Sequence, residues 1–282
     1  MTTATGDQRW LIALDIDGTL VHDDGYLSPR VAAEVKRVQD LGHLVVVATG
    51  RSAVNAIGVT KEIGLLDGKL IASNGAVTVK IKPEHPRGFE TEEVITFDPT
   101  DVLTKLIASL PDAHFAVEDA EGVYKYHKHF PADALGDINH ETPLDQLMHQ
   151  PVSRIVVLSP EHETEEFVDT VATLGLSSVS YAIGYSAWLD IAPLGVTKAS
   201  ALEAVRAHNN IRPDQIITVG DGRNDISMFE WAQAGGGLAF AMGQGPDEVH
   251  AAASFVTDAV EDDGVASVLS GFEGILFTRS VG

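Results

Sequence analysis

Unbroken apolar runs alternate with amphipathic stretches in the N-terminal part of the chain. Such runs are typical of strands that a parallel sheet buries on both faces, and they lie at 10–14, 44–48 and 70–72. The stretch 28–42 predicts a helix, because Ser28 is a good N-cap, Pro29 suits the first turn, and valines recur every three or four positions. This order of elements predicts an α/β fold built on a right-handed, doubly wound parallel sheet.

The pattern changes after residue 82. Up to residue 184 the apolar positions mostly alternate with polar ones, as in half-buried strands, and helices are expected at 98–110 and 161–175. We therefore expect an inserted α+β cap domain over 83–185, entered through the Pro-rich linker 82–88. The alternation of strands and helices resumes at "AWLDIAP", so residues 1–82 and 186–282 are expected to form one core.

Polar side chains follow four of the predicted core strands. In an open α/β sheet, ligands bind beyond the carboxyl ends of the strands, so we expect these side chains to share one crevice. They are Asp15 and Asp17 in "LDIDGTLV", Thr49, Gly50 and Arg51 in "VVVATGR", Ser73, Asn74 and Gly75 in "SNGA", and Asp221, Asn224 and Asp225 in "GDGRND".

Several carboxylates in one crevice raise each other's pKa and cost stability unless a cation neutralises them. Oxygen ligands without His or Cys favour Mg²⁺. Taken singly, Asp15 and Asp17 are also good turn formers, Asp225 a helix cap and Lys198 a surface lysine. Lys198, however, opens a predicted helix, where the helix dipole disfavours it, which suits a residue that binds a phosphoryl group.

This set of residues predicts phosphoryl transfer. Asp15 can attack phosphorus to give an aspartyl-phosphate, while Asp17 protonates the leaving oxygen and later takes a proton from water. Mg²⁺ and Lys198 would balance the charge on the phosphoryl oxygens, and the Thr49 hydroxyl could bind the same oxygens.

The amino-acid composition restricts the classes of binding partner and of site that this chain can have. The 282 residues include 19 Lys and Arg against 41 Asp and Glu, a formal charge of -22, which argues against nucleic acid and anionic membranes as partners. The absence of cysteine excludes disulfides, a thiolate nucleophile and a cysteine zinc site. The start of the chain does not resemble a signal peptide, and no apolar run approaches the ~20 residues of a membrane helix, so a cytoplasmic location is expected. The sequence allows a homodimer.

Four ordered motifs resemble those of the haloacid dehalogenase-like phosphatases, in the Cof-like sugar-phosphatase branch with a large α/β cap. They are "DIDGTL", "VVVATGR", "GVTK" and "GDGRNDI". The resemblance implies a Rossmann-like core and a Mg²⁺-dependent phosphatase acting on a small phosphorylated metabolite, with a sugar phosphate favoured. The alternatives are a phosphomutase and a non-catalytic metal- or ligand-binding regulator.

The resemblance also implies a role for each matching residue. Asp15 would be nucleophile and metal ligand, and Asp17 the acid/base, whose backbone carbonyl also meets the metal. Thr49 and Lys198 would hold the phosphate. Asp221 would be a metal ligand, and Asn224 and Asp225 would support the metal site and its waters. Asn74 and Gly75 would line the phosphate or substrate entrance.

Two core positions depart from the branch. Arg223 stands where a small or acidic residue is usual, and Gln244 with Gly245 replaces the more usual Asn and Ala. In the cap, Tyr126 and His127 are candidates for substrate selection on an exposed strand. His127 and His129 lack a third ligand for a metal, so a surface strand is the favoured interpretation.

Overall fold

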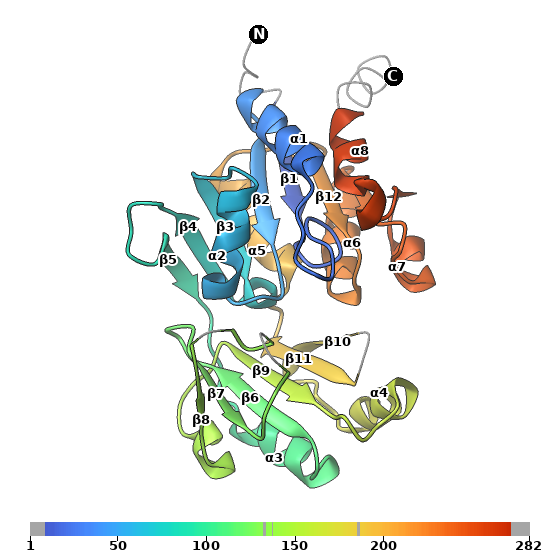
Figure 1. Ribbon diagram of the computed structural model, residues 1–282. Coiled ribbons are helices and arrows are strands. Elements are labelled where there is room, and N and C mark those ends of the chain that lie inside the picture. The colour runs from blue at the N-terminus through green and yellow to red at the C-terminus, as the bar shows by residue number, and fades with distance from the viewer. Residues whose placement is uncertain (1–8, 132–133, 137, 185–186, 272–282) are drawn as a thin grey trace.

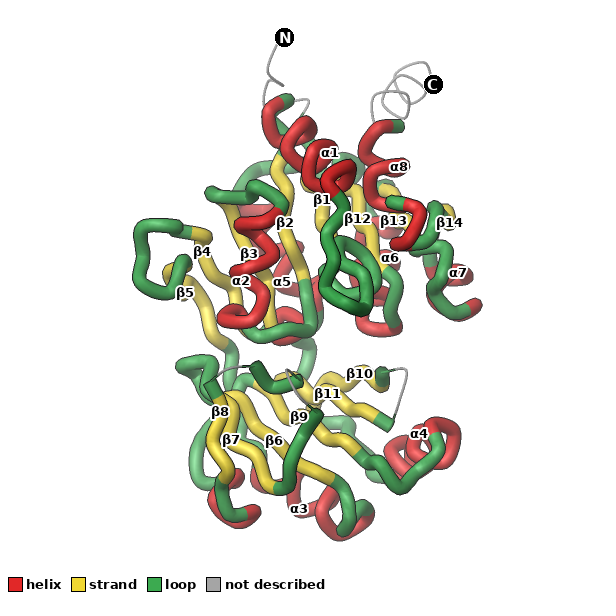
Figure 2. The backbone as a smooth tube through the Cα atoms, in the orientation of Figure 1, coloured by secondary structure: helices red, strands yellow, loops and turns green. Residues whose placement is uncertain are grey.

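The computed structural model describes residues 9–131, 134–136, 138–184 and 187–271, which form two sheets (Figure 1). The large sheet has the order β14-β13-β12-β1-β2-β3-β4-β5, and the small sheet the order β10-β11-β9-β6-β7-β8. Figure 2 shows the strands of both sheets, with loops lying between the large sheet and the small sheet. The α/β fold class, a doubly wound core with an inserted domain, is confirmed. The N-terminal segment 1–8, from which no signal peptide is predicted, lies outside the described residues.

Six strands of the large sheet run parallel, as the apolar runs predict. They are β1 (Leu11–Leu14), β2 (Leu44–Ala48), β3 (Gly68–Ala72), β12 (Ile216–Gly220), β13 (Leu238–Ala241) and β14 (Phe255–Val256). Two further strands at one edge, β4 (Val77–Ile81) and β5 (Phe89–Val94), run antiparallel to their neighbours.

Helices cover both faces of the large sheet (Figure 1). One face packs on α1 (Pro29–Asp40), α2 (Ala53–Glu62) and α8 (Gly264–Ser270), and the other on α5 (Lys198–His208), α6 (Ile226–Ala234) and α7 (Asp247–Ala252). Ile12 and Leu14 of β1 join the first cluster, while Leu11 and Ala13 join the second. Burial on both faces explains why these strands show no polar alternation.

The predicted first helix is confirmed in detail. Ser28 is the N-cap of α1 and its hydroxyl accepts a hydrogen bond from the backbone N–H of Arg30. Pro29 occupies the first turn, and the predicted valines Val31, Val35 and Val38 are buried. The helix therefore forms from a capping residue, a proline with a suitable φ, and one apolar stripe.

The small sheet carries two helices on one face and turns the other toward the large domain (Figure 1). Its strands are β6 (His114–Glu118), β7 (Tyr124–His127), β8 (Asn139–Glu141), β9 (Arg154–Leu158), β10 (Val179–Ile183) and β11 (Trp188–Pro193). The helices are α3 (Thr100–Ser109) and α4 (Thr164–Thr173). Phe115, Val117 and Ile155 pack under them, whereas Ala116 and Val156 face the other way, as the period of two predicts.

The two sheets divide the chain at points other than the expected ones. The segment 82–88 is the loop of the β4–β5 hairpin and not a linker, since Lys82 N–H donates to the carbonyl of Gly88. Similarly, "AWLDIAP" forms β11, which pairs antiparallel with β9 and β10 in the small sheet. The chain thus crosses between sheets near residues 95 and 194, not at 82/83 and 185/186. The expectation was wrong because edge strand β5 is half polar like a cap strand, while β11 is apolar like a core strand.

The turn after β3 has an unusual backbone. Ser73, Asn74 and Gly75 all have positive φ, of 50°, 52° and 105°. The N–H of Ser73 donates to the carbonyl of Arg51, and that of Asn74 to the carbonyl of Thr49, so the ends of β2 and β3 are tied together. A Cβ on Gly75 would lie 2.2 Å from the carbonyl oxygen of Thr197, just before α5. Only glycine allows this approach.

We expect Gly75→Ala to lower the free energy of unfolding by about 2–4 kcal/mol, because the methyl group meets backbone and the φ is unfavourable. Gly25→Ala is the matched control: φ is +81° there, but no atom lies within 4 Å of the added carbon, so only about 1 kcal/mol should be lost. Urea unfolding of the two variants measures both losses. Equal losses would contradict the close approach.

Candidate active site

The carboxyl ends of the core strands and the facing side of the small sheet enclose a cavity of about 600 Å³. That volume lies within the usual range for small-molecule sites. From the core, the cavity is lined by predicted residues, namely Asp15, Asp17, Gly50, Arg51, Asp221 and Asn224. The small sheet contributes Tyr124, Arg154, Trp188 and Asp190. The predicted convergence of several strand ends is therefore present in the structure.

A buried group of charges lies at the core end of this cavity. Asp15, Asp221 and Asp225 each offer a carboxylate oxygen within 4.8 Å of the others. The Nζ of Lys198 lies 2.7 Å from Asp15 Oδ1 and 2.7 Å from Asp225 Oδ1. The other oxygen of Asp225 accepts hydrogen bonds from the backbone N–H groups of Asp221 (3.0 Å) and Gly222 (2.9 Å). Lys198 at the start of α5 is thus a partner of two carboxylates and not a surface residue.

The charges in this group do not balance. Burial raises the pKa of Asp15 well above its usual value, and the charges of Asp225 and Asp221 raise it further, while Lys198 opposes them. Burial lowers the pKa of Lys198, but Asp15 and Asp225 outweigh that effect and raise it. Three carboxylates facing one ammonium fit a hard divalent cation, which would remove the repulsion and restore an ionised Asp15.

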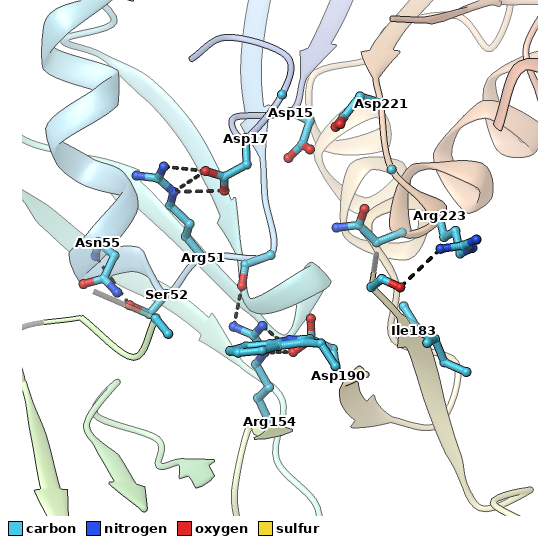
Figure 3. A pocket seen from close by; sticks show the side chains of 18 of the residues that line it. Asp15, Asp17, Arg51, Ser52, Asn55, Arg154, Ile183, Asp190, Asp221 and Arg223 are labelled. Atoms are coloured by element: carbon cyan, nitrogen blue, oxygen red, sulfur yellow. Dashed lines mark hydrogen bonds and ion pairs between the residues drawn. The ribbon is translucent and has the colours of Figure 1, made fainter. Parts of the chain in front are cut away.

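Asp17 lies apart from the buried group, with 61% of its side chain exposed. Arg51 Nε donates to both of its carboxylate oxygens, at 3.1 and 3.0 Å, and Arg51 Nη2 also binds Oδ1. Figure 3 shows this pair, with Asp15 and Asp221 lying together beside it. The hydrogen bonds from Arg51 to Asp17 raise the pKa of the guanidinium. The side chain of Asp17 therefore contacts Arg51 and not the carboxylates expected to hold metal.

The remaining predicted residues surround this centre. Thr49 is fully buried, and its Oγ1 accepts a hydrogen bond from the N–H of Arg51 at 3.1 Å. Asn224 Nδ2 donates to Asn74 Oδ1 at 3.0 Å. Asn74 and Lys198 line a second, smaller cavity of about 110 Å³. Asn224 lines both cavities. Gly75 holds the turn against the start of α5, as described above.

Three cap residues near the site have no counterpart among the predicted ones. Arg154 donates to Asp190 Oδ1, to the Tyr124 hydroxyl at 2.9 Å, and to the backbone carbonyl of Gly50 in the core. Its contact with Asp190 is visible in Figure 3. Burial lowers the pKa of Arg154, but Asp190, Tyr124 and Glu118 outweigh that effect and raise it. A single charge in each of two apolar strands, "RIVVL" and "WLDIAP", was the signal in the sequence.

Glu118 makes a second contact between cap and core. Its Oε2 accepts hydrogen bonds from the Ser73 hydroxyl at 2.6 Å and from the Tyr124 hydroxyl at 3.2 Å. Burial is the main reason why its pKa is raised. Through Glu118 and Arg154, the small sheet contacts two of the strand-end loops that carry predicted phosphate-site residues, those after β2 and β3.

The two core residues that depart from the family branch, Arg223 and Gln244, both make hydrogen bonds to other elements. Arg223 pairs with Glu248 on α7, and its Nη1 donates to the carbonyl of Gly184 in the cap at 3.2 Å. Gln244 Nε2 donates to the carbonyl of Gly18, and its Oε1 accepts from the N–H of Val260. Arg223 thus links core and cap, while Gln244 supports the loop that follows Asp15.

The cap candidates chosen from sequence lie elsewhere. Tyr126 and His127 are not among the residues that line either described cavity. Tyr126 is partly buried against a small apolar cluster that includes Trp188 as a neighbour. The strand ends at His127, and Lys128 has a φ of 58°, so Lys128 does not continue the strand face. In the described part of the chain, the one group of acids and histidines able to hold an ion is the Asp15 group.

Residues 12–269 match the haloacid dehalogenase-like hydrolase family, and the chain belongs to it. It is 27% identical over 269 residues to the 5-amino-6-(5-phospho-D-ribitylamino)uracil phosphatase YitU of Bacillus subtilis, covering 92% of this chain and 96% of that protein. It is 28% identical over 261 residues to a phosphoglycolate phosphatase of Natronomonas pharaonis, covering 92% and 95%.

Solved structures share the fold. The HAD subclass IIB sugar phosphatase BT4131 superposes with a TM-score of 0.77 at 21% identity, covering 94% of this chain and 99% of its own. The phosphatase BT1666 of Bacteroides thetaiotaomicron gives 0.75 at 24%, covering 97% and 98%. These findings confirm the family resemblance and the expectation of a phosphatase enzyme. Within the described residues, every helix is too short or too polar to cross a bilayer.

We expect Asp225→Asn to lower the free energy of unfolding by about 1–3 kcal/mol, since it removes one of the two buried carboxylates that bind Lys198 and weakens the hydrogen bonds that Asp225 accepts. Asp40→Asn breaks an exposed ion pair with Lys36 and should change the free energy by no more than about 0.5 kcal/mol. Urea unfolding in chelator compares the two. A loss at Asp225 as small as that at Asp40 would show that the buried pair contributes little.

Proposed function

We propose that the protein is a Mg²⁺-dependent phosphatase that hydrolyses a small phosphorylated metabolite, with a sugar phosphate favoured. The observation that carries the proposal is the buried Asp15, which faces a cavity beside Lys198 and two further carboxylates. The two relatives named above are phosphatases of small phosphorylated molecules by name, although their leaving groups differ.

Asp15 is the proposed nucleophile. One of its carboxylate oxygens attacks phosphorus, and the bond from phosphorus to the leaving oxygen breaks as Asp17 gives that oxygen a proton. Water then attacks phosphorus, passes a proton to Asp17, and frees Asp15 and inorganic phosphate. For these steps Asp17 must turn from Arg51 into the cavity, because both of its oxygens now contact the guanidinium.

Lys198 and Thr49 are the proposed holders of the phosphoryl oxygens. An ammonium group has three N–H donors, and Asp15 and Asp225 take two of those of Lys198, which leaves one for a phosphoryl oxygen. Further contacts to the phosphate or the rest of the substrate are proposed for five surrounding residues, Gly50, Arg51, Asn74, Gly75 and Asn224.

The proposed metal ligands are Asp15, Asp221 and Asp225, with the backbone carbonyl of Asp17. When bound, Mg²⁺ would supply positive charge to the phosphoryl oxygens. Asp15 would then be ionised and aligned for attack. The cap is proposed to cover the cavity, exclude water and contact the leaving group, because Arg154, Trp188 and Asp190 line the wall opposite Asp15.

We expect Asp15→Asn to reduce kcat at least about a thousandfold on every phosphomonoester, because an amide cannot form the covalent intermediate. Asp17→Asn should impair alkyl phosphates much more than p-nitrophenyl phosphate, whose leaving oxygen needs no proton. Asp67→Asn, an exposed aspartate that does not line the cavity, is the control. Phosphate release measures all three, and near-normal turnover by the Asp15 variant would overturn the mechanism.

We expect Mg²⁺ to stabilise the folded protein, by about 2.7 kcal/mol at a concentration a hundred times its Kd. Asp221→Ala should abolish most of this gain, because it removes one of the clustered carboxylates. Calorimetric titration and thermal unfolding, each with Mg²⁺ or chelator, test binding without relying on activity. Undiminished Mg²⁺ binding by the variant would place the ion elsewhere.

A further inference from the structure

Each arginine that lines the large cavity is already paired with a carboxylate, within the part of the chain that the structure describes. Arg51 pairs with Asp17, and Arg154 with Asp190, both inside the cavity. Arg223 pairs with Glu248. When Asp17 turns toward the leaving oxygen, Arg51 loses this partner, whereas Arg154 and Arg223 keep theirs. An anionic group on the cap side of the cavity would therefore have to compete with a carboxylate for either of these two guanidinium groups.

The cavity is also rich in carboxylates. Three guanidinium groups line it, against the five carboxylates of Asp15, Asp17, Asp23, Asp190 and Asp221. Behind its wall, Lys198 and Asp225 neutralise each other. A divalent cation and a phosphoryl dianion would cancel one another in charge. Asp17 in its acid form carries no charge, but the four other carboxylates still outnumber the three guanidinium groups when both are bound. A second negative charge on the substrate would meet this excess in a partly enclosed space, where repulsion is strong.

The wall opposite Asp15 suits a neutral body that carries hydroxyl groups. Trp188 lines it, and the indole packs against the ring of Phe130 in a T-shaped contact, with ring centroids 5.8 Å apart. The hydrogen bonds from Arg154 to Asp190 both go to Oδ1. Oδ2 of Asp190 is therefore available to accept from a substrate hydroxyl. An aromatic face beside a carboxylate oxygen is a common way to bind a polyhydroxylated chain or ring.

We propose that the leaving group is neutral and hydroxyl-bearing, and that this enzyme discriminates against phosphomonoesters whose leaving group carries a carboxylate or a second phosphate. The inference rests on the proposed phosphatase function and narrows its substrate. It separates this chain from its phosphoglycolate phosphatase relatives, whose named substrate carries a carboxylate. Asp190 is the specificity-determining residue, because it neutralises Arg154 and faces the leaving group.

Matched substrate pairs test the charge rule on the unmodified protein. We expect kcat/KM to be at least about tenfold higher for sorbitol 6-phosphate than for 6-phosphogluconate, and for 2-hydroxyethyl phosphate than for 2-phosphoglycolate. Within each pair, length and carbon number match while the far group changes from hydroxyl to carboxylate. Equal values, or a preference for the anionic member in both pairs, would overturn the inference.

Asp190→Asn tests the proposed residue. The amide oxygen can still accept from Arg154, but the loss of one negative charge leaves the guanidinium with unbalanced positive charge. The ratio of kcat/KM for 6-phosphogluconate to that for sorbitol 6-phosphate should rise at least about fivefold. Asp169→Asn, which removes the same charge from an exposed position on α4, should leave the ratio unchanged. An unchanged ratio in the Asp190 variant would exclude that residue as the selector.

The two proposals fail in different ways. If p-nitrophenyl phosphate and both substrate pairs release no phosphate, the phosphatase proposal itself is wrong. If phosphate is released from the aryl ester but the pairs show no preference, the phosphatase proposal stands and the charge rule is wrong. Should Asp190→Asn fail to fold, the comparison on the unmodified protein still decides the charge rule.

Discussion

The bond that joins Lys198 to Asp15 and Asp225 is the interaction on which the site depends. An ammonium group without solvent is stable only beside carboxylates, and carboxylates without solvent are stable only beside a cation. Because the three residues follow β1, begin α5 and follow β12, this mutual need fixes two strand ends and the start of one helix in one place. Three carboxylates still face one ammonium in this group, so a divalent cation would complete its charge balance.

The core of this site could be predicted from sequence because its charged residues stand at positions where local preference alone would not place them. Asp15 follows an apolar run, and a strand that ends in the middle of a sheet opens onto a ligand site. Lys198 sits where the helix dipole disfavours a cation, so a structural reason was missing before its partners were known. Such contradictions between local preference and residue type mark function more reliably than any single motif.

The cap half of the site could not be predicted in the same way. Arg154 and Asp190 each stand alone in an apolar strand, 36 positions apart, and their pairing depends on β9 and β11 being neighbours in the sheet. Local sequence contains no information on strand order. Without that information, the sequence pattern places β11 in the core. It also singles out Tyr126 and His127, whereas Tyr124 is the residue of β7 that lines the cavity. Side-chain pattern determines which face is buried, whereas topology determines what it is buried against.

The contact between Arg154 and the carbonyl of Gly50 has an evolutionary consequence. Every residue has a backbone carbonyl, so substitution at position 50 cannot delete the acceptor, and only changes at position 154 can remove the bond. The two positions are therefore not expected to covary, even though they touch across the boundary between the sheets. Substitutions elsewhere in the small sheet would then leave its bond to the loop after β2 intact as long as Arg154 is retained. Methods that find contacts from paired substitutions would overlook this one.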